Sequence, residues 1–179
     1  MKWFVLALGL LIAGLAFAQE GWIDRQGHRI PDTPSRKSIA GFGGSIIVTS
    51  DADWKEKWET PTETVPSFSE AKTVHRGKKI FVLIFFANPG LSDQGKADVT
   101  CDIDLTNPKG TSSMHQTDLV GYRGALKNDP HQTYLAAPVV GFVGDPGDAA
   151  GEWGFRVLLK DNVRHVTLPL KTSFVLLDK

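Results

Sequence analysis

Ala97-Asp-Val-Thr-Cys-Asp-Ile-Asp-Leu105 is the stretch that decides the fold, because apolar and polar side chains alternate along its whole length. This period of two is typical of a β-strand that turns one face to a core and the other to water. The same alternation recurs over residues 153–159 and 166–176, and no long amphipathic helix pattern occurs. The sequence therefore predicts an all-β protein, an antiparallel β-sandwich with one short helix.

A second predicted strand, residues 80–86, is apolar on both faces, so its outer face needs a cover. The preceding residues 51–59 predict a short helix with Trp54 and Trp58 four residues apart on one face. We expect this helix to pack its two indoles on the outer face of the strand. The alternative is that the apolar face is an exposed patch for a partner.

Two prolines fall within the apolar stretches that predict strands. Pro138 interrupts residues 133–143, and Pro169 lies in the last strand. Because proline has no backbone N–H for the ladder, we expect both residues at sheet edges or bulges.

The first residues predict export. Lys2 gives a short positive start, an apolar run follows it, and Ala16-Phe17-Ala18 places small residues where signal peptidase requires them. No second apolar run is long enough to span a bilayer, so no integral membrane segment is expected after cleavage near Ala18. We therefore expect a periplasmic or secreted protein, in three parts: a signal peptide over residues 1–18, an irregular N-terminal arm over residues 19–44, and a β-sandwich domain over residues 45–179.

The net charge and the cysteine count limit which partners and which cellular compartment are expected. Removing Lys2 with the signal leaves 19 basic and 20 acidic residues, a net charge of −1 with neutral histidines. Nucleic acid needs a concentrated basic surface and is not expected as a partner. The single cysteine, Cys101, cannot form an intramolecular disulfide, which favours a bacterial periplasm over a eukaryotic secretory route. Its apolar neighbours in the strand pattern predict a buried thiol.

Asp148-Ala149-Ala150-Gly151-Glu152-Trp153 resembles the corner that enters a late strand of immunoglobulin-like domains. Trp153 stands where that corner usually has a tyrosine, and no cysteine follows at Phe155, so the antibody-type bridge is absent. Residues 145–177 are also similar to immunoglobulin-like modules of small exported bacterial proteins of unknown function. The resemblance implies an immunoglobulin-like layout for the β-sandwich and brings no catalytic residues with it.

Large aromatic side chains are the candidate ligand or partner surface. Trp54 and Trp58 share a helical face, and Trp22 anchors the arm. Tryptophan is enriched where partners bind, because one indole removes a large apolar area from water. The competing interpretation of the helical pair is a structural role in the core.

Carboxylates in one loop are the candidate metal ligands, since calcium prefers such oxygens. They are Asp145, Asp148 and Glu152, and a second acidic row lies on one strand face at Asp98, Asp102 and Asp104. Aspartates beside glycine and proline also occur in ordinary turns, and alternating aspartates in solvated faces. Met114-His115 with the distant Cys101 offers soft ligands for copper, but without the spacing of exported copper proteins. No cofactor is expected.

These observations favour an exported periplasmic binding or protein-interaction module, which takes a protein partner or a small ligand. The alternatives are a hydrolase with a spatially assembled site, with His115 or His131 as the base beside loop aspartates, or a calcium- or copper-binding periplasmic protein. A histidine bonded to both a carboxylate and a hydroxyl would favour the hydrolase.

Overall fold

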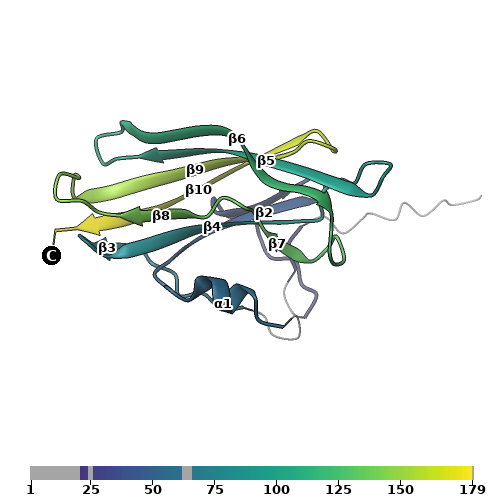
Figure 1. Cartoon of the computed structure of the whole chain (residues 1–179), viewed down its shortest axis with the longest axis horizontal. Helices are drawn as coiled ribbons and strands as arrows, with labels where there is room; N and C mark the ends of the chain where they lie inside the picture. Colours follow the sequence, from purple (N-terminus) through teal and green to yellow (C-terminus); the bar gives the residue numbers. More distant parts are fainter. Residues whose placement is uncertain (1–20, 24–25, 62–65, 179) are drawn as a thin grey trace, which may run out of the picture.

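The computed structural model describes residues 21–23, 26–61 and 66–178 of the chain (Figure 1). The predicted signal peptide, residues 1–18, lies outside these residues. Over the described ranges the chain forms ten strands and one helix: β1 (Arg36–Ile39), β2 (Phe42–Thr49), α1 (Trp54–Trp58), β3 (Thr73–His75), β4 (Lys79–Ala87), β5 (Lys96–Thr106), β6 (Ser112–Ala125), β7 (Thr133–Leu135), β8 (Val140–Val143), β9 (Gly151–Asp161) and β10 (Val166–Leu177). No helix in this part of the chain has the length and apolar character that a membrane crossing needs.

The strands form two five-stranded sheets. In the first sheet the order is β1-β2-β4, and both β7 and β8 pair with the far side of β4; the second has the order β3-β10-β9-β5-β6. Every pairing is antiparallel except that of β3 with β10. The predicted all-β sandwich with one short helix is therefore confirmed, whereas its immunoglobulin-like layout stays a prediction.

The core lies between the sheets and uses the inward side chains of the alternating strands. Cys101 and Ile103 of β5 lie opposite Leu159 and Val157 of the neighbouring β9, and all four belong to one cluster of buried side chains. Cys101 is fully buried, as the alternation predicted, and burial raises the pKa of its thiol to about 11. The thiol is therefore a small apolar core group rather than a nucleophile.

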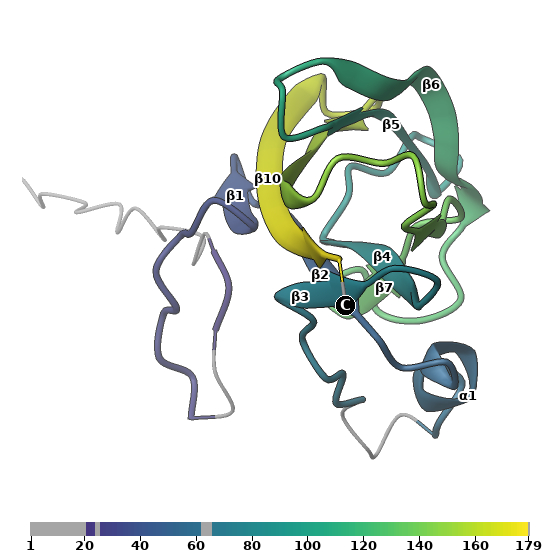
Figure 2. The same ribbon diagram turned by 90° about the vertical axis from the view of Figure 1, so that its left-hand side faces the viewer.

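Helix α1 covers the outer face of β4. The ring centroids of Trp54 and Phe81 are 6.0 Å apart, and those of Trp58 and Phe85 are 5.3 Å apart. Leu83, between the two phenylalanines on this face, is fully buried. Figure 2 shows the helix outside the sandwich, beside β4 and β7. The expectation that both indoles cover this strand is confirmed, so the Trp pair has a structural role.

Regular structure begins earlier than the sequence predicted. The arm expected over residues 19–44 contains β1 and the start of β2, joined by Ala40 and Gly41 with φ of 48° and 80°. Two positive φ values in a two-residue loop are those of a type I′ hairpin turn. Gly44 belongs to the core, because a Cβ there would lie 2.5 Å from Leu168 Cδ2. Close packing therefore requires the glycine at position 44. Because glycines in a sequence also suggest a flexible loop, this hairpin was not predicted from the sequence.

Both prolines lie at sheet edges, as predicted. Pro138 falls in the break between β7 and β8, the edge strands beside β4. Pro169 pairs with Leu158 of β9, while β3 covers the other side of β10 only from Val175 onward. The edge of β10 that carries Pro169 is therefore open before Val175.

Candidate functional site

The predicted metal ligands do not converge. Asp148 Oδ2 accepts a hydrogen bond from the Asp145 N–H at 2.9 Å, so this carboxylate closes its own turn. Glu152 lies on β9, where its Oε1 accepts a bond from Ser173 Oγ at 2.7 Å. No group of three or more His, Cys, Asp or Glu side chains within the described residues is arranged to hold a metal ion.

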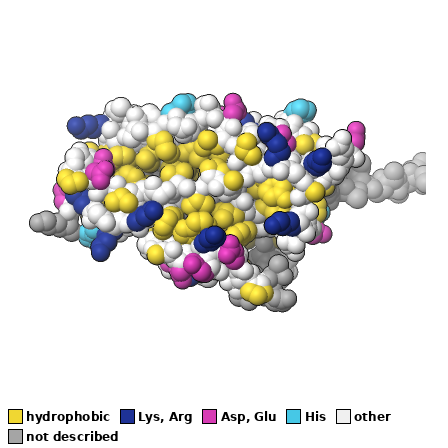
Figure 3. Space-filling view, in the orientation of Figure 1, with side chains coloured by type: hydrophobic (Ala, Val, Ile, Leu, Met, Phe, Trp, Pro, Cys, Tyr) yellow, Lys and Arg dark blue, Asp and Glu magenta, His cyan; other side chains and the backbone are white. Residues whose placement is uncertain are grey.

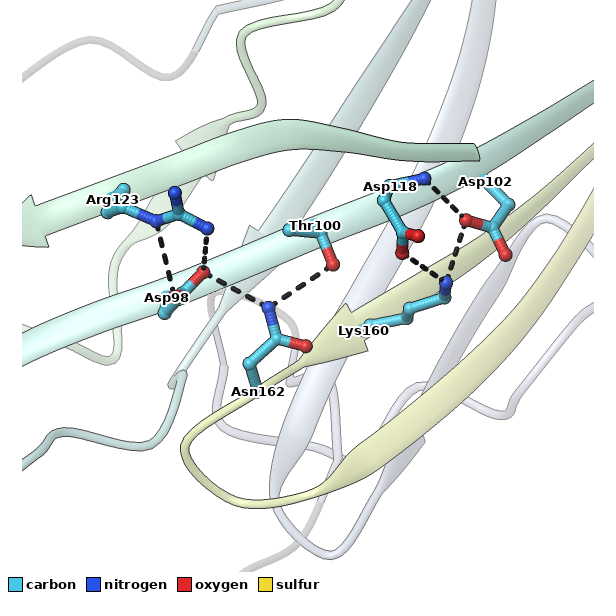
Figure 4. Close-up of polar contacts among 7 residues, drawn as sticks. All are labelled: Asp98, Thr100, Asp102, Asp118, Arg123, Lys160 and Asn162. Atoms are coloured by element: carbon cyan, nitrogen blue, oxygen red, sulfur yellow. Dashed lines mark hydrogen bonds and ion pairs between the residues drawn. The ribbon is translucent and has the colours of Figure 1, made fainter. Parts of the chain in front are cut away.

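The acidic row of β5 is neutralised by bases from the neighbouring strands (Figure 4). Lys160 of β9 lies 2.7 Å from Asp102 and 2.8 Å from Asp118 of β6, and the Asp118 N–H donates to Asp102. Partial burial raises the pKa of Asp102, but these hydrogen bonds outweigh it and hold the pKa below its ordinary value. Asp118 has a φ of 53° at an irregularity of the β5–β6 register. The network therefore fixes a bulge in β6.

The other end of the row is paired in the same way. Arg123 of β6 contacts Asp98 with two nitrogens at 3.2 Å, and the Asn162 amide donates to Asp98 and to Thr100. Desolvation raises the pKa of Asp98, and the bonds from Asn162 and Arg123 lower it by more. These carboxylates have protein partners and tie three strands together, which is a structural arrangement.

Trp22, a predicted surface residue, lines a cavity. Its Nε1 donates to the Lys37 carbonyl at 3.0 Å, and its ring covers Gly43, where a Cβ would lie 3.2 Å from the indole. A cavity of about 210 Å³ lies beside it, and His131 and Thr133 are among the other residues that line this cavity. Glycine at position 43 is therefore what allows the arm to fold onto β2.

His131 does not meet the condition for the hydrolase alternative. Its Nδ1 lies 3.0 Å from Asp129 Oδ1, in a turn where the imidazole is 77% exposed. Its ring and its backbone N–H both bond Asp129, and among the described residues no hydroxyl bonds to it. His115 is exposed on β6 near the Asp102 network.

Apolar side chains are also exposed on the face shown in Figure 3, where they gather around β8 and between β8 and α1. Strand β6 carries the half-exposed Val120, and β8 carries Val143. Such a surface offers contact area but few polar groups that would orient a ligand.

A groove of about 440 Å³ lies between β2 and β10, and we call it the edge groove. Its walls include Ile47 of β2, and Lys171, Ser173 and Val175 of β10. Figure 2 shows β10 arching past β1 and β2 on this side of the molecule. Neighbouring residues of the same two strands, Val48 among them, also line it, and two segments close its ends, Pro34 with Ser35 and Glu70 to Lys72.

Main-chain hydrogen bonds close both ends of the edge groove. At one end, the Pro34 carbonyl accepts from the Lys171 N–H at 2.8 Å, and Ser35 bonds Ile46 of β2. At the other end, the Lys72 carbonyl accepts from the Val175 N–H at 2.9 Å. Both end segments thus bond the edge of β10 as a neighbouring strand would, and the stretch between them has no such strand.

The open stretch of β10 leaves main-chain groups facing the groove. In an extended strand the N–H and C=O of alternate residues point to the same side. Since the N–H groups of Lys171 and Val175 point to the groove, so do the N–H and C=O of Ser173. Among the described residues, no backbone group bonds the Ser173 N–H on this side.

Two cations border these groups. Lys72 and Lys171 are exposed at opposite ends of the groove, and within the described residues neither ammonium has an ion-pair partner. Glu70 is the one acidic side chain among the lining residues. The edge groove therefore combines unpaired main-chain groups with a positive rim. None of these residues was predicted from the sequence. The one related signal in the sequence was Pro169, which predicted that its strand lies at a sheet edge.

Comparison with known proteins gives weak structural likenesses. No protein-family model matches the chain, and no curated protein matches it. A family 123 glycoside hydrolase from Clostridium perfringens aligns with a TM-score of 0.44 and 11% identity, over 77% of this chain and 28% of that one. The alkylpurine DNA glycosylase AlkC of Pseudomonas fluorescens aligns with a TM-score of 0.38 and 12% identity, over 59% and 27% of the two chains.

A Niemann-Pick type C2 protein from the Japanese carpenter ant gives a TM-score of 0.37 at 10% identity, over 74% of this chain and 89% of that one. This chain spans less than a third of the length of the first two proteins. All three TM-scores are below 0.5, so the likenesses carry no argument about this protein.

Proposed function

We propose that this protein is an exported, periplasmic binding module, and that the edge groove is its binding site. The observation that carries the proposal is the combination of a cavity of about 440 Å³ with main-chain groups of Ser173 that have no partner on that side among the described residues. Ser173 is exposed on this edge, so its main-chain N–H and C=O are accessible to a ligand that pairs with a strand edge.

The other sites are less suited to recognition. The Trp54 and Trp58 rings pack on β4, and the carboxylates of the β5 row already have cationic partners. In the edge groove, by contrast, the ammonium groups of Lys72 and Lys171 are available to a ligand that carries negative charge. Export is supported by the first eighteen residues of the sequence.

The test is nuclear magnetic resonance of the ¹⁵N-labelled mature protein with periplasmic extract added in fractions. We expect one fraction to shift the amide resonances of Ser173 and Val48, which line the groove. Lys72→Glu with Lys171→Glu should abolish the shifts. Lys109→Glu with Lys127→Glu, both exposed residues outside the groove, is the control with the same change in charge. Shifts around Trp22 and His131 instead would reject the edge groove as the site.

A further inference from the structure

We infer that the edge groove takes a short extended peptide segment, which adds to the open edge of β10 as a strand and carries an acidic side chain toward the lysines. This inference rests on the proposed function and names the chemistry of the ligand. Strand addition of this kind draws affinity from main-chain hydrogen bonds.

The protein's own chain shows what fits at the two ends of this edge. Pro34 and Lys72 each present a carbonyl to β10, and each belongs to a segment that also bonds β2: Ser35 accepts from Ile46, and Ala71 donates to Val48. At both ends of the open edge, β10 therefore already pairs with the main chain of another segment. A ligand with the same backbone would continue this pairing across the open middle.

The length of the open edge sets the size of the segment. Lys171 and Val175, the two residues of β10 whose N–H groups are already bonded, are four residues apart. At about 3.3 Å per residue, the edge between them is about 13 Å long. About three residues of an extended peptide fit there, and Ser173 supplies the central donor and acceptor.

Charge selects among such segments. Lys171 lies at one end of the open edge and Lys72 lies at the other. Because both side chains are positively charged, they favour a neutral or acidic segment over a basic one. Glu70 lies on the Lys72 side of the groove and adds repulsion toward a second acidic group there. The two lysines and Glu70 together favour a segment with one acidic side chain, placed in its middle.

The probe is the capped tripeptide acetyl-Val-Glu-Val-amide, which matches the three-residue opening and whose valines favour an extended backbone. It is titrated into the ¹⁵N-labelled mature protein, beside two derivatives that are N-methylated at the odd or at the even residues. The parent should shift the Ser173 amide. Because only alternate residues face β10, the derivative methylated on those residues should bind at least tenfold more weakly than the other.

A protein variant tests the same bond from the other side. Ser173→Pro removes the central donor, and the strand should tolerate it, because Pro169 occupies the equivalent position four residues earlier. Thr167→Pro removes a donor on the same side of β10, outside the groove, and is the matched control. We expect Ser173→Pro to weaken parent binding at least tenfold and Thr167→Pro to leave it unchanged.

Three outcomes would overturn the inference. If both methylated peptides bind as tightly as the parent, side chains rather than the main chain are recognised. If the parent does not bind while a periplasmic fraction still shifts Ser173 and Val48, the groove binds another chemical class and the proposed function survives. If neither the peptide nor any fraction shifts these amides, both proposals fail.

Discussion

Replacing Trp58 with alanine should destabilise the protein by about 2 to 3 kcal/mol. Truncating a fully buried tryptophan costs about 3 to 5 kcal/mol, and Trp58 is half-buried, so about 2 kcal/mol comes from lost burial. Its ring contact with Phe85 at 5.3 Å adds on the order of 0.5 to 1 kcal/mol. For a chain of this size, the melting temperature should fall by about 5 to 10 °C.

Thermal unfolding followed by circular dichroism measures this loss, and urea unfolding gives the free energy independently. Lys55→Ala is the matched control on the same helix, because the Lys55 side chain is 66% exposed and its ion pair with Glu59 spans 3.9 Å. The control should change stability by no more than about 0.5 kcal/mol. If Trp58→Ala melts within 1 °C of the control, helix α1 contributes no stability, and its indoles must be reassigned to a partner surface.

Three further predictions follow from buried or paired groups. The hydrogen bonds from Lys57 and from the Ser69 N–H lower the pKa of Asp51 from 3.8 to about 2. The ionised carboxylate therefore stabilises the folded state above pH 4, and this contribution, on the order of 1 kcal/mol, is lost as the pH falls toward 2. Urea unfolding at several pH values should show this loss in the parent protein and not in Asp51→Asn. Ellman's reagent should leave Cys101 unmodified in the native protein and modify one thiol in denaturant, since the side chain is fully buried; modification at the same rate in both would contradict that burial. Gly44→Ala should cost about 1 to 3 kcal/mol in urea unfolding through its clash with Leu168, whereas Gly147→Ala, with open space around it, should be neutral.

The elements with a clear period in the sequence are those that could be predicted. The alternation from Ala97 to Leu105 defines β5, and the apolar outer face of β4 required the cover that Trp54 and Trp58 supply. These inferences succeeded because each periodic pattern, in the strands and in the helix, lies within a few neighbouring residues. Burial of one face is recorded directly in such local patterns.

What the sequence could not show depends on contacts between distant segments. Gly44 suggests flexibility until Leu168 is placed against it. The edge groove needs Pro34 and Lys72 at opposite ends of one stretch of β10, and no local pattern records that arrangement. Pro169 gave a partial signal, because a proline within a strand marks an edge without saying what lies beside it.

The two exposed strand edges of the second sheet differ in what they allow between molecules. Strand β6 is long, but the bulge at Asp118, held by Lys160, interrupts the regular spacing that another copy would need to pair along it. Between Pro34 and Lys72 the β10 edge is unbulged but only about three residues long, and beyond Pro34 the edge contains Pro169, which has no N–H to donate. That length matches the short segment we propose, whereas a long strand of a second molecule would not fit between Pro34 and Lys72. Both edges are therefore poor templates for continuous strand pairing between copies of the chain.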